Sequence, residues 1–189
     1  NYNVTLKALD HLKNFPEVKI ALSLSDPGLV MGFKNKFLEL ESYGLDYIFG
    51  NDDEVKAFVD EDDIDKALTK LQEKPYTSII TMGEKGSVVV TKDEVLSSPQ
   101  VNITPVDTNG AGDMYAGSFM HAYLQGNNIE DCASFSNYAS SKVVETFGPR
   151  LSSDGYKKVL KFKSCVSIIE YEDPIEIALR YNSNSKLVT

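Results

Sequence analysis

The chain has 189 residues, and its 19 Lys and Arg against 28 Asp and Glu give a formal net charge of -9. This excess of negative charge disfavours nucleic acid and anionic membrane surfaces as partners. The sequence has no run of about 20 apolar residues, the length that a membrane-spanning helix needs, and its first residues lack the pattern of a signal peptide. We therefore expect one soluble, cytoplasmic domain over residues 1–189 that binds neither nucleic acid nor membranes.

Cysteine and histidine are too sparse to suggest a disulfide framework or a zinc site. Cys132 and Cys165 form no CxxC pair, which favours a reducing compartment. His11 and His121 lie far apart, without a Cys/His cluster around either of them. We therefore expect no zinc site and interpret both histidines as structural or surface residues.

Helical and strand-like patterns alternate through the first half of the chain. Apolar residues recur at helical spacing between Leu6 and Phe15, whereas short apolar runs bounded by Pro or Gly are typical of strands. In chain order we predict a helix over 6–15, a strand over 18–24, a helix from Phe33 that ends before Gly44, a strand over 45–49, helices over 55–59 and 64–71, and a strand over 78–82.

Glycine turns and longer helical patterns mark the second half. Gly83 and Gly86 are typical of a hairpin. After them we predict strands over 87–91 and 101–106, helices over 111–124, 129–147 and 153–162, a strand over 166–169, a helix over 175–181 and a frayed end over 182–189. The tail over 165–189 matches no motif, so its structure stays open.

This order of elements predicts the fold class. Strands that alternate with helices need crossover connections, and these place mainly parallel strands in one sheet with helices on both faces. The sequence has no internal repeat and no linker rich in Pro, Gly or Ser, which favours a single domain. We therefore predict an α/β domain of three layers, α-β-α.

A segment of unusual composition lies between a predicted strand and a predicted helix. Gly110, Ala111 and Gly112 have almost no side chain, so their backbone N–H groups can approach an anion. The helix that follows adds unpaired amides and the positive end of its dipole. The carboxylate of Asp113 would repel a statically bound phosphate, but it suits a general base that takes the proton of an attacking hydroxyl. The segment therefore indicates phosphoryl transfer.

A structural interpretation of the same segment stays open. Asp107 or Asp113 could cap the helix, and the glycines could serve only to permit a tight turn. The segment is neither a GxxxxGK[ST] phosphate loop nor a dinucleotide-binding GxGxxG motif. Those two classes of nucleotide site are therefore set aside.

The string DTNGAGD, residues 107–113, resembles the DTxGAGD signature of the PfkB carbohydrate kinase family, which includes ribokinase, fructokinases and adenosine kinase. The resemblance covers about residues 18–160, and the string SLSDP at 23–27 is most similar to the adenosine-kinase-like branch of sugar and nucleoside kinases. The other matching strings are NDDE at 51–54, which resembles the NxxE motif, TMGEKG at 81–86, which resembles the TxGxxG nucleotide loop, and the helix and turn from Asn137 to Arg150.

The resemblance implies a ribokinase-like fold and an ATP-dependent kinase that uses Mg²⁺. It implies Asp113 as the catalytic base, with Gly110, Ala111 and Gly112 as the anion hole for the transferring phosphoryl group. The further roles that it implies are Glu54 holding Mg²⁺ through water, Asn51 near the phosphates, Thr81, Gly83 and Gly86 along the nucleotide, Asn137 beside the adenine or ribose, and Asp107 binding a monovalent cation such as K⁺.

Each of these segments also has a structural interpretation. The residues from Asn51 to Glu54 could form a helix cap with acids in the first turn, Gly83 and Gly86 could be hairpin glycines, Asn137 could be a polar surface residue, and Asp107 could be a turn former. Taken together the segments favour function, because one phosphoryl-transfer mechanism explains them all.

PfkB kinases are longer than this chain, and their amino-terminal half carries an early glycine pair, most sugar contacts and a β-sheet lid. The sequence shows none of these, so it resembles the carboxy-terminal portion of such a kinase. A sheet without its first strands exposes an edge and apolar surface. We therefore expect a homodimer or association with the missing amino-terminal part, and the acceptor cannot be read from this sequence.

Three hypotheses of function follow from the motifs. The leading one is an ATP-dependent kinase that transfers the γ-phosphoryl group to a hydroxyl of a sugar or nucleoside, with Asp113 as general base. The alternative is a truncated, catalytically inactive module that binds nucleotide or regulates a partner. A vitamin-phosphorylating branch of the same fold is disfavoured, because it usually varies the NxxE and DTxGAGD strings.

Overall fold

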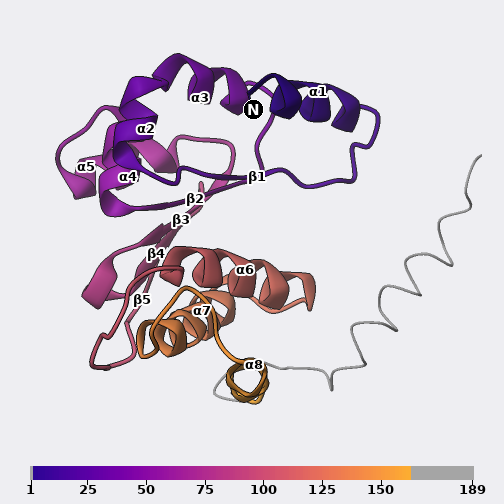
Figure 1. Cartoon of the computed structure of the whole chain (residues 1–189). Coiled ribbons are helices and arrows are strands. Elements are labelled where there is room, and N and C mark those ends of the chain that lie inside the picture. Colours follow the sequence, from indigo (N-terminus) through magenta and orange to yellow (C-terminus); the bar gives the residue numbers. More distant parts are fainter. Residues whose placement is uncertain (1, 163–189) are drawn as a thin grey trace, which may run out of the picture.

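Five strands form one mixed sheet in the computed structural model, which describes residues 2–162 (Figure 1). The first three strands are parallel to one another, and the last two each pair antiparallel with their neighbour. The strands lie in chain order as β1 (Ala21–Ser23), β2 (Tyr47–Asn51), β3 (Thr77–Thr81), β4 (Ser87–Val90) and β5 (Val95–Ser98). The elements predicted over 166–169 and 175–181 lie outside the described residues.

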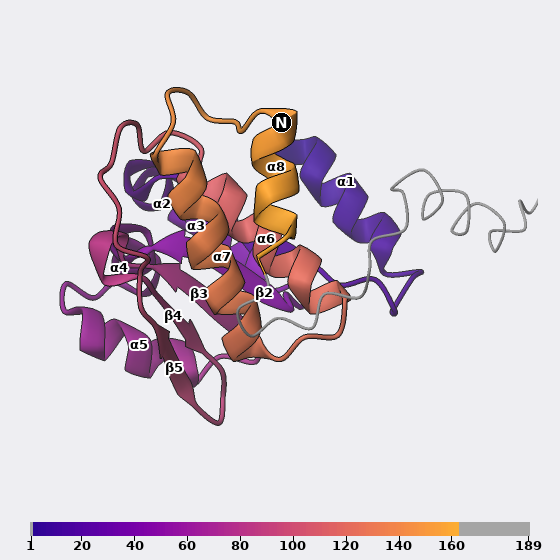
Figure 2. The same ribbon diagram turned by 90° about the horizontal axis from the view of Figure 1, so that it is seen from below.

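Helices cover both faces of this sheet, which confirms the predicted α/β fold of three layers (Figure 1). Figure 2 looks onto the face that α6 (Ala111–Leu124), α7 (Ile129–Val144) and α8 (Ser153–Leu160) cover. The other face carries α2 (Pro27–Gly32), α3 (Lys34–Glu41), α4 (Asp52–Val59) and α5 (Ile64–Gln72). The first helix, α1 (Tyr2–Leu12), lies beside α3, and a short 3₁₀ turn, η1 (Gly83–Lys85), joins β3 to β4.

Alternation along the strands divides the core into two clusters. On β2, Tyr47 and Phe49 pack toward α6 and α7, whereas Ile48 between them packs toward α4. Successive side chains of a strand point to opposite faces, so each strand stabilises both layers. Fully buried side chains such as that of Phe119 each contribute about 2 kcal/mol through removal of apolar area from water.

One predicted strand is wrong. Residues 101–106 form no strand, and the strand that follows β4 is instead β5, over 95–98. The backbone N–H groups of Val106 and Asp107 donate to the carbonyl of Val144 at the end of α7, at 2.8 and 3.2 Å, and Pro105 has no N–H to give to a sheet. The segment is therefore bonded to a helix end rather than to a neighbouring strand.

The helices agree more closely with the sequence. The structure confirms the predicted helix over 111–124, and α7 ends three residues before the predicted end at 147. The sequence interpretation missed α2, although Asp26 caps it by accepting from the N–H of Leu29 at 2.7 Å and Pro27 occupies its first position. Within residues 2–162, none of the helices has the length and apolar character that crossing a bilayer requires.

Candidate active site

The parallel strands end at a cavity that brings four of the sequence motifs together. Asn51 and Thr81, the last residues of β2 and β3, are direct partners in the sheet register. The cavity has a volume of about 330 Å³. Its walls include Ser23, Ser25, Asn51, Glu54, Thr81, Gly110, Gly112 and Asp113. Ligands of open α/β sheets commonly bind outside the carboxyl ends of the strands, so the position itself is typical of a functional site.

Asn51 and Glu54 form a closed capping box at the amino end of α4. The side-chain oxygen of Asn51 accepts from the N–H of Glu54 at 2.8 Å, and the carboxylate of Glu54 accepts from the Asn51 N–H at 3.0 Å and from its side-chain amide at 2.8 Å. The predicted capping role is therefore confirmed. It leaves a functional role open, because both residues also line the cavity.

The carboxylate of Glu54 is a buried charge with no cationic partner among the described residues. Glu54 is 7% exposed. Burial raises the pKa of the Glu54 carboxyl above its ordinary value, and the carboxylates of Asp26 and Asp52 raise it further, while the hydrogen bond from the Asn51 backbone opposes the shift. A cation in the cavity would offset this cost.

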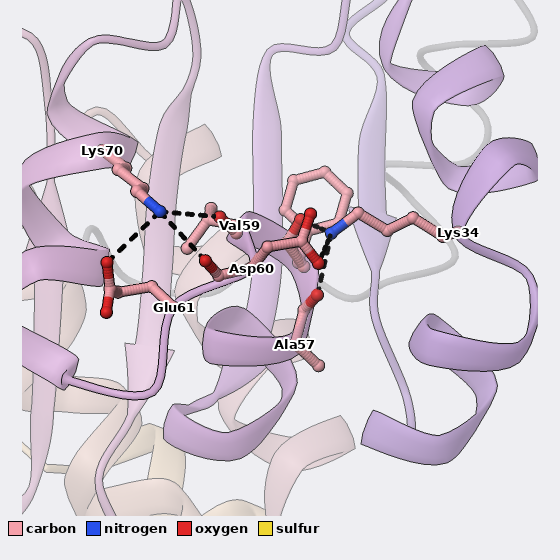
Figure 3. A network of polar contacts seen from close by, with 7 residues as sticks. Lys34, Ala57, Val59, Asp60, Glu61 and Lys70 are labelled. Atoms are coloured by element: carbon pink, nitrogen blue, oxygen red, sulfur yellow. Dashed lines mark hydrogen bonds and ion pairs between the residues drawn. The ribbon is translucent and has the colours of Figure 1, made fainter.

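The opposite end of α4 is bound by two lysines (Figure 3). The ammonium group of Lys34, from α3, donates to the carbonyl oxygens of Ala57, at 2.8 Å, and Phe58, and pairs with Asp60 at 3.0 Å. Lys70, from α5, donates to the carbonyl oxygens of Val59 and Asp60 at 3.2 and 3.0 Å. Positive charge at a helix carboxyl end is favourable, so these contacts hold α4, and with it Glu54, against its neighbours.

The amino end of α6 is built differently. Gly110 precedes the helix at φ 78°, and a Cβ atom there would lie 2.4 Å from the carbonyl oxygen of Pro149. The N–H of Ala111 donates to the carbonyl of Thr108 at 3.2 Å. In the part of the chain that the structure describes, no hydrogen-bond acceptor meets the N–H of Gly112 or Asp113. These free donors are where an anion would bind.

Asp113 stands in the first turn of α6, beside these free amides. Its side chain is exposed and forms no hydrogen bond or ion pair with any of residues 2–162. It borders both the 330 Å³ cavity and a second cavity of about 610 Å³, which Arg150 and Tyr156 also line. The carboxylate is thus open to a ligand from two sides.

A third cavity, of about 550 Å³, adjoins the first and shares Thr81, Gly112 and Tyr115 with it. It contains the predicted nucleotide-side residues, and we call it the nucleotide cavity below. Its walls come from four segments: Thr81, Gly83, Glu84 and Gly86; Gln100 to Ile103 with Pro105; Thr108, Ala111, Gly112 and Tyr115; and Asn137, Ser140 and Val144.

Gly86 holds the hairpin side of the nucleotide cavity in place. It has φ 93°, and a Cβ atom there would lie 2.1 Å from the carbonyl oxygen of Ser98. No other residue would fit this close approach of two backbone segments. The glycine is therefore required by the hairpin itself, in agreement with the structural interpretation, and it also borders the cavity.

Asn137 joins a buried hydrogen-bond network that the sequence interpretation did not find. Its side-chain nitrogen lies 3.1 Å from the Ser87 hydroxyl and 3.0 Å from both the carbonyl and the hydroxyl oxygens of Ser98, and Tyr115 donates to Ser87 at 2.8 Å. Asn137 is 2% exposed, so the alternative of a surface residue is wrong. Nothing in the sequence around Ser87, Ser98 or Tyr115 signals that these side chains meet.

Asp107 links the loop before α6 to the loop after α7. Its carboxylate oxygens accept from the backbone N–H groups of Asn109 and Gly148, each at 3.0 Å. These two hydrogen bonds hold the pKa of the Asp107 carboxyl below its ordinary value, and the bond from Asn109 has the larger effect. The predicted turn-forming role is confirmed, and the binding of a monovalent cation by Asp107 stays a prediction.

The donor set fits magnesium better than a metal that needs a protein cage. Within residues 2–162, no three His, Cys, Asp or Glu side chains gather to hold a metal ion together. Magnesium commonly binds through one or two carboxylates together with waters and substrate phosphates. The buried Glu54 carboxylate, facing the same cavity as the free amides of α6, offers that kind of incomplete site.

Comparison with known families agrees with this geometry. Residues 2–154 match the model of the pfkB family carbohydrate kinase, which is more than half of the chain. The chain belongs to the pfkB family. In this family member, the strings at 23–27, 51–54, 81–86 and 107–113 meet at the 330 Å³ cavity. The segment 137–150 contributes Asn137 to the nucleotide cavity and Pro149 and Arg150 to the 610 Å³ cavity.

Curated relatives of this pfkB protein are nucleoside and sugar kinases. Adenosine kinase 1 from Arabidopsis thaliana is 32% identical over 142 residues, which cover 67% of this chain and 41% of the plant protein. A nucleoside kinase from Methanocaldococcus jannaschii is 37% identical over 84 residues, which cover 44% of this chain and 28% of the archaeal protein. The chain thus spans less than half the length of the curated relatives it matches.

Solved structures show the ribokinase-like fold. Adenosine kinase from Sinorhizobium meliloti aligns with a TM-score of 0.70 and 34% identity, over 74% of this chain and 43% of that one. Ribokinase from Thermotoga maritima aligns with a TM-score of 0.64 and 27% identity, over 82% of this chain and 52% of that one. The fold that the motifs implied is therefore confirmed for the described residues.

Proposed function

We propose that this chain contains the nucleotide-binding and catalytic portion of an ATP-dependent kinase that phosphorylates a hydroxyl of a nucleoside or sugar. One observation carries the proposal. The free N–H groups of Gly112 and Asp113 lie beside the unpaired carboxylate of Asp113, on the 330 Å³ cavity, which shares Gly112 with the nucleotide cavity and Asp113 with the 610 Å³ cavity. That arrangement places anion donors and a proton acceptor at one point.

The chemistry follows from these groups. The Asp113 carboxylate would accept the proton of the acceptor hydroxyl, which makes the hydroxyl oxygen a better nucleophile. As that oxygen bonds to the γ-phosphorus, the bond to the bridging oxygen breaks and ADP leaves. The free amides of Gly112 and Asp113, within the predicted anion hole of Gly110, Ala111 and Gly112, would stabilise the charge of the transferring group together with the positive end of α6. Both contributions depend on Gly110, because its left-handed φ begins the helix at this point.

Glu54 and Asn51 are proposed to serve the metal side of the reaction. Glu54 would hold Mg²⁺ through water, and Asn51 would orient the Glu54 carboxylate while lying near the phosphates. When bound, the ion supplies positive charge that offsets the phosphate oxygens. Thr81, Gly83 and Gly86 would border the nucleotide, and Asp107 would add a monovalent cation site.

The substrate class is proposed from the relatives. Adenosine, nucleoside and deoxyribose kinases are among the matched proteins, so a nucleoside or sugar hydroxyl is the expected acceptor. Replacing Asp113→Asn, in this chain and in any longer product that contains it, should lower turnover about a thousandfold. ATP binding, measured by calorimetry, should be kept, because Asn removes the proton acceptor and leaves the backbone donors in place.

Asp154→Asn is the matched control, since it makes the same change at an exposed carboxylate on α8. Turnover in that variant should equal wild type. Unchanged turnover in Asp113→Asn would contradict the assignment of the base. ATP binding without turnover against a panel of nucleosides and sugars, in every form of the protein, would favour the inactive nucleotide-binding module instead.

A further inference from the structure

Ser25, between β1 and α2, has a strained backbone. Its φ is 70°, and across it the N–H of Asp26 donates to the carbonyl of Leu24 at 2.9 Å. This hydrogen bond closes a γ-turn of the rarer form with positive φ, which is strained for any residue that has a side chain. Glycine would adopt the same φ without strain. The serine side chain at this position therefore costs the fold some stability.

The other residue of this kind has a local reason for its conformation. Among the non-glycine residues of 2–162, only Ser25 and Asp60 have a positive φ. Asp60 is the C-cap of α4, where the left-handed conformation is common because it ends the helix. Ser25 follows a strand and ends no helix. Strained residues gather at functional sites, so Ser25 is a candidate for a role in binding.

Ser25 has two hydrogen-bond donors that no other described residue uses. Neither its backbone N–H nor its hydroxyl bonds to any of residues 2–162. Backbone turns that include a left-handed residue can present such groups to an anion. Ser25 is exposed and borders the 330 Å³ cavity, as Glu54 and Asp113 do. The cavity is therefore bordered by open donors from two separate elements, the turn at Ser25 and the first turn of α6.

The charges around this cavity make neutral donors important. Its walls include the carboxylates of Glu54 and Asp113, and residues 2–162 contribute no Lys, Arg or His to them. A phosphoryl group in this cavity would therefore be held by N–H and O–H donors, together with a metal ion. Each donor on the cavity wall then carries a larger share of the binding than it would beside a cationic side chain.

The position of Ser25 indicates which part of a nucleotide it would meet. The nucleotide cavity shares Thr81, Gly112 and Tyr115 with the 330 Å³ cavity, whereas Ser25 borders only the latter of the two. A nucleotide whose base and ribose occupy the nucleotide cavity would reach Ser25 only with the end of its triphosphate.

We propose that Ser25 holds the γ-phosphoryl group of ATP, through hydrogen bonds that its hydroxyl and its backbone N–H donate to the phosphoryl oxygens. This inference rests on the proposed function, because that function places the triphosphate in this cavity. The strained turn fixes both donors before the ligand binds, so less orientational freedom is lost on binding. Ser25 acts from the end of β1, and the amides of Gly112 and Asp113 act from α6.

The comparison of ATP with ADP isolates this contact, because the two ligands differ only in the γ-phosphoryl group. Calorimetric titration with each nucleotide and Mg²⁺ gives both affinities for wild type and for Ser25→Ala, which keeps the backbone N–H and removes the hydroxyl. We expect Ser25→Ala to bind ATP about tenfold more weakly than wild type, and ADP with unchanged affinity. An equal loss for both nucleotides, or a loss for neither, would overturn the proposal.

Ser25→Gly separates the strain from the hydroxyl. Glycine relieves the strain of the positive φ, so the melting temperature should rise by about 2 °C, while ATP affinity should still fall about tenfold relative to ADP affinity. Damage to the fold cannot explain a more stable protein that binds ATP more weakly. A wild-type ratio of ATP to ADP affinity in Ser25→Gly would overturn the proposal.

Ser97→Ala is the matched control for the loss of a hydroxyl. Ser97 is exposed on β5, its hydroxyl bonds to none of residues 2–162, and it lies outside both cavities. Both affinities should equal those of wild type, and a selective loss of ATP affinity in Ser97→Ala as well would overturn the proposal. If wild type binds neither nucleotide, the proposed nucleotide site itself fails. If wild type binds both and the Ser25 variants match it, only the role of Ser25 fails.

Discussion

The amino ends of α4 and α6 open onto the same cavity, yet one carries a side-chain capping box and three acids while the other has no side-chain cap. At α4, the paired hydrogen bonds of Asn51 and Glu54 cap two N–H groups. The carboxylates of Asp52, Asp53 and Glu54 in the first turn offset the positive character of the remaining free amides. At α6, Gly110 offers no side-chain cap, and the N–H groups of Gly112 and Asp113 stay open. The first end therefore presents a fixed carboxylate, and the second presents anion donors.

The two helix ends therefore suit different parts of one ligand, a cation at α4 and a phosphate at α6. A closed cap aims a negative group, here Glu54, and so suits a cation. An open helix end has a net positive character, and so suits a phosphate. The two lysines at the carboxyl end of α4 strengthen the difference, because they fix that helix without bringing positive charge to the cavity (Figure 3).

The largest expected effect comes from Gly110→Ala, which breaks the open end of α6. The φ of 78° costs an alanine about 1 kcal/mol, and the new Cβ would also meet the Pro149 backbone at 2.4 Å. We expect a loss of more than about 2 kcal/mol in the free energy of unfolding, together with loss of ATP binding. Denaturant unfolding and calorimetry measure the two effects.

Gly126→Ala separates backbone strain from close contact. Gly126 has φ 84°, but a Cβ atom there would meet nothing within 4 Å. Gly126→Ala should lower the free energy of unfolding by about 1 kcal/mol through strain alone and leave ATP binding unchanged. If Gly110→Ala costs no more than Gly126→Ala, then the approach of Gly110 to Pro149 does not shape the end of α6.

Gly112→Ala sharpens the same comparison from the ligand side. Gly112 has no positive φ, and its Cβ would meet nothing within 4 Å in the ligand-free chain. Because alanine is the better helix former, stability should rise by up to about 1 kcal/mol. ATP affinity should fall about tenfold, since the methyl group would enter the space where phosphate approaches the amides.

Gly117→Ala is the matched variant in the same helix, with an equally open Cβ position. It should give the same gain in thermal stability with no change in ATP affinity. An ATP affinity of Gly112→Ala equal to that of Gly117→Ala would show that the phosphates do not approach the first turn of α6.

The smallest effect concerns the closed end, through the pH dependence of stability. The pKa of the Glu54 carboxyl lies above its ordinary value of 4.5 in the folded chain. The folded chain therefore binds that proton more tightly, and the contribution to stability is present below pH 4.5 and is lost as the pH rises through the raised pKa. Thermal melts from pH 4 to 8 without metal should show this loss in wild type relative to Glu54→Gln.

Glu61→Gln is the control with the opposite sign. Lys70 holds the pKa of the Glu61 carboxyl below its ordinary value, so its contribution is present above pH 4.5 and is lost as the pH falls through the lowered pKa. The two variants should therefore diverge from wild type in different pH windows. If the melting temperatures of Glu54→Gln and wild type change equally with pH above 4.5, the Glu54 carboxylate is not a buried, unpaired charge.

Local motifs could be predicted from the sequence because neighbouring residues determine them. Gly110 to Asp113 begin a helix at the expected residue, and Asn51 with Glu54 forms a cap that spacing alone indicates. The strand predicted over 101–106 failed because its alternating Val and Ile residues satisfy the same local pattern, while the pairing partner is chosen by tertiary contact. β4 pairs instead with Val95–Ser98, which contains two serines.

The buried network was beyond sequence reasoning for the same reason. Ser87, Ser98, Tyr115 and Asn137 come from four elements, and each is an ordinary residue in its own segment. Only their juxtaposition shows that Asn137 is buried and that its amide is oriented.

The most direct test of the account follows individual backbone amides during ligand binding. In ¹⁵N-labelled chain titrated with ATP and Mg²⁺, the N–H resonances of Gly112 and Asp113 should shift in a saturable way, with the affinity that calorimetry gives. The N–H of Glu54, already bonded to Asn51, should shift less. Saturating ATP that leaves the Gly112 and Asp113 resonances unmoved would contradict the claim that the open end of α6 binds the phosphates.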